Sequence, residues 1–157
     1  MVIMEIKDFG TVKLELDPKE APITVAHFEK LVKEGFYDGL TFHRIIQGFM
    51  IQGGDPTGTG YGDPGQERIK GEFQINGVNN TIHHGPGVIS MARSQNPNSA
   101  SSQFFICHVD CAYLDGQYAA FGKVVEGMDV VDRVARVRTN FSDKPLEPVI
   151  IEKMYLA

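Results

Sequence analysis

The sequence predicts a mainly β fold, a closed antiparallel β-barrel capped by two α-helices. Many short strand-like runs follow one another at regular spacing, separated by turns rich in glycine, proline, asparagine and aspartate. Only two segments show the apolar spacing of a helix. Because strands and helices do not alternate along the chain, a doubly wound parallel sheet is not expected.

The bulk composition is that of an ordinary globular protein. The 157 residues fit a single domain, residues 1–157, which is long enough to bury a core. A net charge of -5 argues against general nucleic-acid or anionic-membrane binding, which needs a basic face. No run approaches eighteen apolar residues, so we expect no membrane span and a cytoplasmic location. The spacing of Cys107 and Cys111 matches no common zinc or redox motif, which favours unpaired thiols over a disulfide.

The first elements are a hairpin and a helix. Val2–Ile6 and Thr11–Leu16 alternate apolar and polar residues around a short turn, which is typical of a β-hairpin with one solvated face. A helix is predicted from Pro22 to about Glu34, with Gly35 as its C-terminal cap. Its apolar stripe consists of Val25, Phe28, Leu31 and Val32.

The remaining chain reads as short strands, two long loops and one short helix. We predict strands at Thr41–Ile46, Phe49–Gln52, Val88–Ala92, Gln103–Cys107, Ala119–Val125 and Pro148–Leu156. The short helix is predicted at Gly127–Arg133. Gly53–Gly71 and Arg93–Ser102 are predicted to be surface loops, and loops of this length are usually functional or mobile.

The common catalytic constellations are missing from the sequence. The glycine-rich segment Gly58–Gly62 lacks the P-loop lysine and is interpreted as a plain flexible loop. No histidines have metal-ligand spacing, and Ser90 is not in a nucleophile elbow. What remains is a mixed polar and apolar set: Arg44, Phe49, Met50, Gln52, Gln103 and Phe105.

Strand alternation suggests that part of this set faces outward. Gln103 and Phe105 share one side of their strand, whereas Phe104 and Ile106 share the other, all-apolar side. Met50 and Gln52 are related in the same way. From the pattern alone, ordinary core packing is the favoured reading for Met50 and Phe105. A surface salt bridge is as good a reading of Arg44 as a functional role is.

Several ordered blocks of the sequence resemble one family, the cyclophilins, which are peptidyl-prolyl cis-trans isomerases. The resemblance covers essentially the whole chain, and the segment Arg93–Ser102 is most similar to small bacterial members. The blocks are Phe42-His43-Arg44-Ile45-Ile46, Gly48-Phe49-Met50, Gln52-Gly53-Gly54-Asp55, Ser90-Met91-Ala92, Ser102-Gln103-Phe104-Phe105-Ile106, Leu114-Asp115-Gly116 and Phe121-Gly122.

The resemblance implies an eight-stranded barrel closed by two helices, with the active site on its outer face. Arg44 is implied to be the catalytic residue, held by Gln52, and no metal, nucleotide or other cofactor is required. Phe49, Met50, Phe105 and Leu114 are implied to form the proline pocket. The remaining substrate-binding residues implied are His43, Ala92, Arg93, Gln103, Tyr113 and Tyr118.

Two departures from the family pattern concern ligand binding. Tyr113 stands where members often carry a tryptophan that contacts cyclosporin, and Tyr118 replaces a histidine common near the pocket. We therefore expect isomerase activity on proline-containing peptides and folding proteins, with at most weak cyclosporin binding. The chain is expected to be a monomer that binds neither nucleic acid nor membranes. The alternative is a proline-peptide binding module or chaperone without catalysis.

Overall fold

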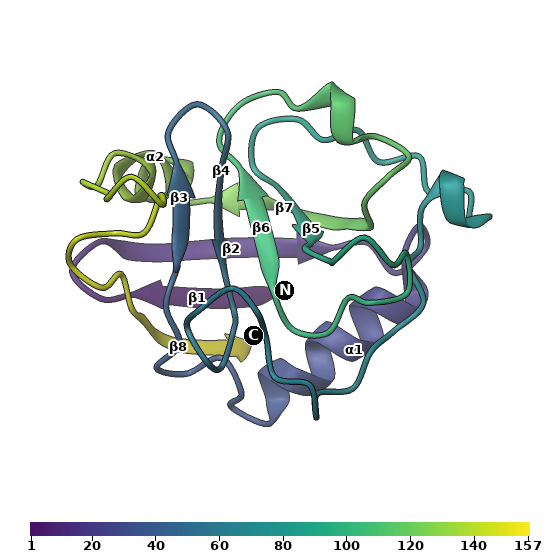
Figure 1. Cartoon of the computed structure of the whole chain (residues 1–157), viewed down its shortest axis with the longest axis horizontal. Coiled ribbons are helices and arrows are strands. Elements are labelled where there is room, and N and C mark those ends of the chain that lie inside the picture. Colours follow the sequence, from purple (N-terminus) through teal and green to yellow (C-terminus); the bar gives the residue numbers. More distant parts are fainter.

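The computed structural model describes residues 1–157, whose eight strands form one antiparallel sheet that curls strongly (Figure 1). The order across the sheet is β3-β4-β6-β5-β7-β2-β1-β8. The strands are β1 (Val2–Ile6), β2 (Gly10–Leu16), β3 (Arg44–Ile46), β4 (Met50–Gly53), β5 (Val88–Met91), β6 (Phe104–Cys107), β7 (Ala120–Glu126) and β8 (Ile151–Leu156).

The prediction of a closed barrel is wrong, because the sheet remains an open, curled half-barrel. Its two edge strands, β3 and β8, do not pair with each other. The edges meet only through a single bridge between Thr41 and Ile150 and a few loop hydrogen bonds. Pro145 and Pro148 lie in the segment that approaches this edge, and proline has no N–H to donate to a ladder. Regular pairing of this segment starts at Ile151, and its partner is β1.

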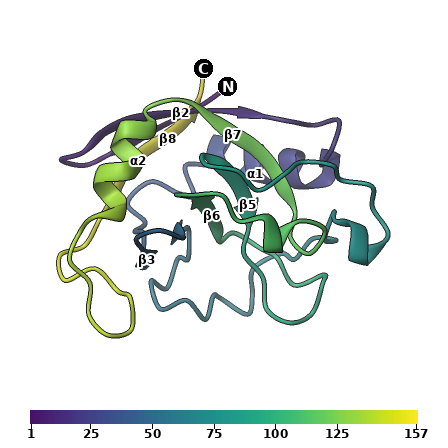
Figure 2. The ribbon, with the colours of Figure 1, turned by 90° about the horizontal axis from the view of Figure 1, so that it is seen from above.

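The two predicted helices are confirmed; they lie at opposite ends of the curled sheet, and both bury their apolar residues in the same main core (Figure 2). Helix α1 (Pro22–Lys33) starts with proline at its first turn and buries its predicted apolar stripe, packing against β8. Helix α2 (Met128–Ala135) buries three valines and an alanine and packs against β2, β3 and β4. Neither helix has the length and apolarity needed to cross a bilayer.

The main core lies on the concave side of the sheet and is rich in aromatic rings. Phe28 of α1 is central: its ring centroid lies 5.1 Å from that of Tyr37, 5.0 Å from that of Phe121 and 5.7 Å from that of Phe104. All four side chains are fully buried. Such aromatic contacts add to the stabilisation gained by burying their large apolar surfaces, so these rings tie α1 to the strands.

A second, smaller apolar cluster lies on the other face of β4 and β6. Ile51 and Ile106 point into the main core, whereas their neighbours Met50, Phe105 and Cys107 belong to the second cluster. This confirms the strand alternation predicted from the sequence. Adjacent residues of a strand point to opposite faces, so a short strand can contribute to two clusters at once.

Several predicted boundaries differ from the structure. The strand predicted at Thr41–Ile46 begins only at Arg44, and the Gln47-Gly48 interruption is a tight hairpin turn in which Gly48 has φ 77°. Two 3-10 turns, η1 (Gln74–Asn76) and η2 (Ala112–Leu114), are not evident from the sequence because three residues carry too little pattern. Both cysteines are free and buried.

Candidate active site

Arg44 lies at the start of β3 with its side chain exposed, directly opposite Gln52 of β4. Its Nη1 donates a hydrogen bond of 3.2 Å to Gln52 Oε1. A guanidinium carries five N–H donors and stays protonated at any physiological pH. The contact with Gln52 therefore orients the group and leaves other donors free.

A directional chain of hydrogen bonds continues from Gln52. Its Nε2 donates to Gln103 Oε1 at 3.0 Å, and Gln103 Nε2 donates to the carbonyl oxygen of Gly60 at 3.2 Å. Each amide accepts at its oxygen and donates at its nitrogen, so the chain fixes which way both side chains point. The orientation of Arg44 thus depends on the loop that carries Gly60.

The buried carboxylate of Asp55 holds that loop in place. Its oxygens accept hydrogen bonds from the backbone N–H of Thr57 (2.9 Å), Gly60 (2.7 Å) and Gly62 (3.0 Å) and from the Thr57 hydroxyl (2.9 Å). Burial opposes the charge, but these hydrogen bonds lower the pKa of Asp55 below its ordinary value. The segment interpreted as a plain flexible loop is therefore tied at several points to one side chain.

A glycine makes the burial of Asp55 possible. Gly54 has φ 88°, a backbone conformation that side-chain-bearing residues rarely adopt. A Cβ there would lie 2.8 Å from the Ser102 carbonyl oxygen and 2.9 Å from the Tyr37 ring. Only glycine lets the chain leave β4 so close to its neighbours and turn Asp55 inward.

Beside Arg44 lies a small, mainly apolar cavity of about 140 Å³. A compact apolar group, such as a five-membered ring, would fit in it. Its lining residues are Arg44, Phe49, Met50, Gln52, Ala92, Arg93, Phe105, Leu114 and Tyr118. Nine of the twelve site residues expected from the sequence thus come together around one cavity.

Arg93 lines both this cavity and a larger, more polar one of about 440 Å³, as Gln52 and Ala92 also do. Its guanidinium carbon lies 4.9 Å from the centroid of the Phe73 ring and 4.7 Å from that of Tyr118. Nε and Nη2 donate to the carbonyl oxygen of Gln117 at 3.1 and 2.7 Å. Gln103 lines the larger cavity only, next to Gly60 and Tyr61. Two adjoining cavities give an extended chain room on both sides of Arg93.

His43 and Tyr113 do not line the small cavity. His43 is buried beneath the Gly60 loop, and neither of its ring nitrogens has a hydrogen-bond partner. Burial lowers its pKa, although the nearby Asp55 charge acts in the opposite direction. Tyr113 is 64% exposed, and its ring lies 6.0 Å from that of Phe49 at the rim.

Sequence reasoning missed two residues that support the site, Asp55 and His84. Asp55 organises the loop beneath Gln103, and an aspartate before Pro-Thr-Gly is a recognised turn signal. His84 stacks on Phe105 from behind the cavity. No local signal could have identified His84, because its contacts come from distant parts of the chain.

The comparisons with known proteins agree with one another. A sequence model described as "Cyclophilin type peptidyl-prolyl cis-trans isomerase/CLD" matches residues 1–156. The chain is 46% identical over 145 residues to peptidyl-prolyl cis-trans isomerase ppi1 of Schizosaccharomyces pombe, covering 92% of this chain and 91% of the relative. It is 42% identical over 152 residues to peptidyl-prolyl cis-trans isomerase-like 1 of Mus musculus, covering 93% and 86% of the two chains.

Solved structures match equally well. A cyclophilin type peptidyl-prolyl cis-trans isomerase of Cryptosporidium parvum, crystallised in the presence of the dipeptide Ala-Pro, superposes with a TM-score of 0.88 at 32% identity, covering 99% of this chain and 98% of that one. The expected resemblance to small bacterial members is not supported, because the curated relatives above are eukaryotic. The chain belongs to the cyclophilin-type family of peptidyl-prolyl cis-trans isomerases.

Proposed function

We propose that this isomerase rotates Xaa-Pro bonds of peptides and folding proteins, with Arg44 as the catalytic residue and the apolar cavity as the proline pocket. One observation carries the proposal: an exposed guanidinium is held by Gln52 at the edge of a small cavity walled by Phe49, Met50 and Phe105. The Ala-Pro dipeptide present with the related Cryptosporidium parvum structure belongs to the same substrate class.

The chemistry explains why arginine suits this position. Rotation about the amide must overcome a resonance barrier of about 18–20 kcal/mol without breaking any covalent bond. In the twisted transition state the prolyl nitrogen regains its lone pair and can accept a hydrogen bond. A donor aimed at that nitrogen stabilises the twisted state more than either planar isomer, which is what accelerates the reaction. Arg44 supplies such a donor and needs no general base.

The cavity walls and the hydrogen-bond chain make Arg44 a more effective hydrogen-bond donor. Burying the ring against Phe49, Met50 and Phe105 excludes water, and this strengthens a hydrogen bond from Arg44. The chain through Gln52 and Gln103 restricts where the guanidinium points before the substrate arrives. The neighbouring cavity offers Gln103 and the backbone around Arg93 for docking the rest of the peptide.

Catalysed exchange tests this function directly. NMR exchange spectroscopy on a panel of Xaa-Pro peptides is expected to show cis-trans interconversion accelerated from tens of seconds to milliseconds, about 10⁴- to 10⁵-fold. Cyclosporin is expected to inhibit only weakly, because Tyr113 provides a phenol instead of an indole. Peptide binding without acceleration would contradict catalysis and favour the binding-module alternative. Full inhibition by stoichiometric cyclosporin at micromolar protein would contradict the weak-binding expectation.

The wider setting is also part of the proposal. We expect one monomeric isomerase domain that works in the cytoplasm and assists protein folding. The two free, buried cysteines suit a reducing compartment. Analytical ultracentrifugation and cell fractionation test these statements, and a stable dimer or a secreted protein would contradict them.

Replacing Asp55 with asparagine is expected to lower the catalysed rate about tenfold by loosening the hydrogen-bond chain. The new amide nitrogen would face N–H donors of Gly60 or Gly62, so that a buried hydrogen bond is lost. The expected cost in unfolding free energy is about 1–3 kcal/mol. Exchange spectroscopy measures the rate and urea denaturation the stability.

The matched control is Asp129→Asn on α2. Asp129 is exposed, lines neither cavity, and its side chain forms only an ion pair of 3.7 Å with Arg133. Its replacement is expected to leave the rate within about twofold, since surface substitutions rarely change stability by more than about 0.5 kcal/mol. Equal rate losses in both variants would show that the Asp55 contacts do not position the site.

A further inference from the structure

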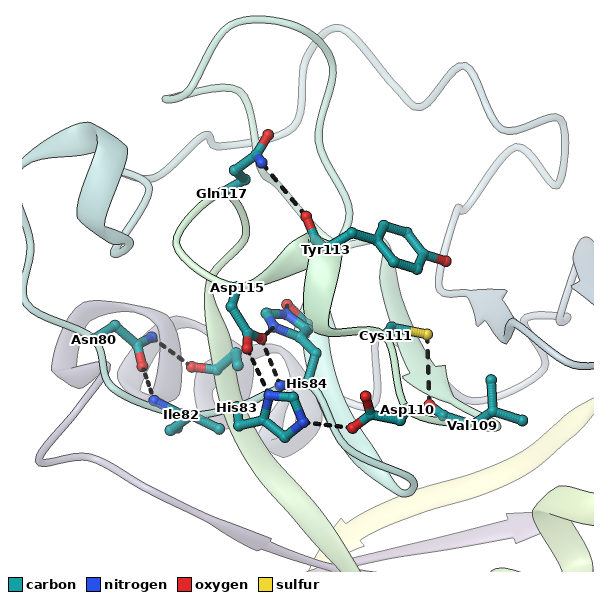
Figure 3. A network of polar contacts seen from close by, with 12 residues as sticks. Asn80, Ile82, His83, His84, Val109, Asp110, Cys111, Tyr113, Asp115 and Gln117 are labelled. Carbon is teal, nitrogen blue, oxygen red and sulfur yellow. Dashed lines mark hydrogen bonds and ion pairs between the residues drawn. The ribbon is translucent and has the colours of Figure 1, made fainter.

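Figure 3 shows a polar network around His83, His84 and Asp115. None of these residues lines the apolar cavity. At the centre of the network is His84, whose side chain is fully buried. The imidazole stacks on Phe105 with 6.1 Å between ring centroids and 17° between ring planes. Tyr118, which does line the cavity, meets the same phenyl ring edge-on at 5.8 Å. Phe105 therefore packs against a second ring that the substrate cannot touch.

Hydrogen bonds at both ring nitrogens hold His84 in one orientation. Nδ1 lies 2.8 Å from Asp115 Oδ1, and Nε2 lies 2.9 Å from the Ser90 hydroxyl. Because an ionised carboxylate can only accept, Nδ1 carries the proton and Nε2 accepts from Ser90. Burial lowers the pKa of His84 and therefore favours this neutral form, although the hydrogen bond and the charge of Asp115 act in the opposite direction.

The hydrogen-bond partners of His84 are neighbours of two cavity-lining residues, Phe105 and Leu114. Ser90 of β5 is directly opposite Phe105 in the β5–β6 ladder. Asp115 follows Leu114 in the chain and also accepts from the His84 backbone N–H at 2.7 Å. The His84 carbonyl in turn accepts from the Cys111 N–H at 2.8 Å, at the base of η2. His84 thus connects the strand behind Phe105 to the turn that carries Leu114.

Ser90, His84 and Asp115 are connected by hydrogen bonds in the same order as the serine, histidine and aspartate of a catalytic triad. These three residues cannot act as one, however. Ser90 is fully buried within the sheet and does not line the apolar cavity. A nucleophile must approach a substrate carbonyl, and a buried strand residue has no such access. The network therefore has a structural role and does not react with a substrate.

We infer that His84 is a positioning residue for the isomerase reaction: it fixes the Phe105 ring as a wall of the proline pocket by stacking on it while being held by Ser90 and Asp115. The inference rests on the proposed role of Phe105 in that pocket. A site performs best when the side chains that touch substrate are locked by a supporting layer of packing and hydrogen bonds. Without the imidazole, Phe105 would have free space behind it and more than one orientation.

The test is His84→Asn, which keeps an N–H donor near Asp115 but removes the ring and cannot reach Ser90. We expect kcat/KM for an Ala-Pro peptide to fall about tenfold and peptide affinity to weaken. The aromatic NMR signals of Phe105 are expected to shift and broaden, while backbone amide signals far from the site stay unchanged. These ring signals distinguish positioning of Phe105 from a general loss of stability.

The neighbouring His83 provides the matched control. It is half-exposed and pairs with Asp110 and with the second oxygen of the same Asp115 (Figure 3). His83→Ala is expected to leave kcat/KM within about twofold and the Phe105 signals in place. An equal loss in His83→Ala would overturn the inference, because the effect would then come through Asp115 alone.

Three further outcomes are decisive. A folded His84→Asn protein with wild-type kcat/KM overturns the inference, whatever the ring signals show. If that variant does not fold, Ser90→Ala takes its place, and unchanged Phe105 signals there overturn the inference. If the wild-type protein does not accelerate exchange, the proposed function fails, and peptide affinity together with the ring signals of His84→Asn still decides the inference.

Discussion

Replacing Arg44 with alanine will lower the catalysed exchange of an Ala-Pro peptide by about 10²- to 10³-fold, the effect expected when one transition-state donor is removed. The fold will stay intact, because the side chain is exposed and makes a single side-chain hydrogen bond, to Gln52. Peptide affinity will change little, since the donor acts on the twisted state more than on the bound planar isomers. NMR exchange spectroscopy measures the rate and peptide titration the affinity.

Two further variants identify the cause of that loss. Arg44→Lys keeps the charge but loses the planar guanidinium, which can donate to Gln52 and direct a second N–H at the prolyl nitrogen. Most of the rate loss is therefore expected to remain. Arg138→Ala removes another exposed arginine, outside the cavity, and is expected to exchange at the wild-type rate. Undiminished exchange in Arg44→Ala would remove Arg44 from the catalytic role.

The parts of this structure that follow from local patterns were predictable from the sequence. Two-residue alternation predicts that Phe104 and Ile106 face inward while Phe105 faces outward, and the structure divides them between two clusters in that way. The apolar stripe of α1 is equally local, and so are its proline start and the glycine after its end. These features depend on backbone geometry within a few residues.

The open sheet and the support of the site depend on contacts that the sequence does not display. Whether β3 meets β8 is decided by edges that lie far apart along the chain. The chain from Gln52 through Gln103 to Asp55 joins a strand, a loop and a buried carboxylate. Family resemblance could point to Arg44, but only the folded chain reveals what aims it.

Replacing Phe105 with alanine will weaken both peptide binding and catalysis, because it removes a wall of the proline pocket. The side chain is only 5% exposed, so its loss also leaves a void and is expected to cost about 3–5 kcal/mol of unfolding free energy. Calorimetric titration with an Ala-Pro peptide measures the affinity and exchange spectroscopy the rate. We expect each to fall at least about tenfold, since the ring loses about 1.4 kcal/mol or more of apolar contact.

The effect of removing the pocket wall must be distinguished from the effect of lower stability, and Leu14→Ala serves as the control for this. Leu14 is fully buried in β2, within the main core and away from the cavity, and its truncation is expected to cost a comparable amount, about 2–5 kcal/mol. Measured at a temperature where both variants are folded, Leu14→Ala is expected to bind and catalyse normally while Phe105→Ala does not. Unchanged affinity in folded Phe105→Ala would show that the proline ring binds elsewhere. Equal losses of affinity and rate in both variants would attribute the effect to lower stability, because Phe105 is expected to contact the substrate and Leu14 is not.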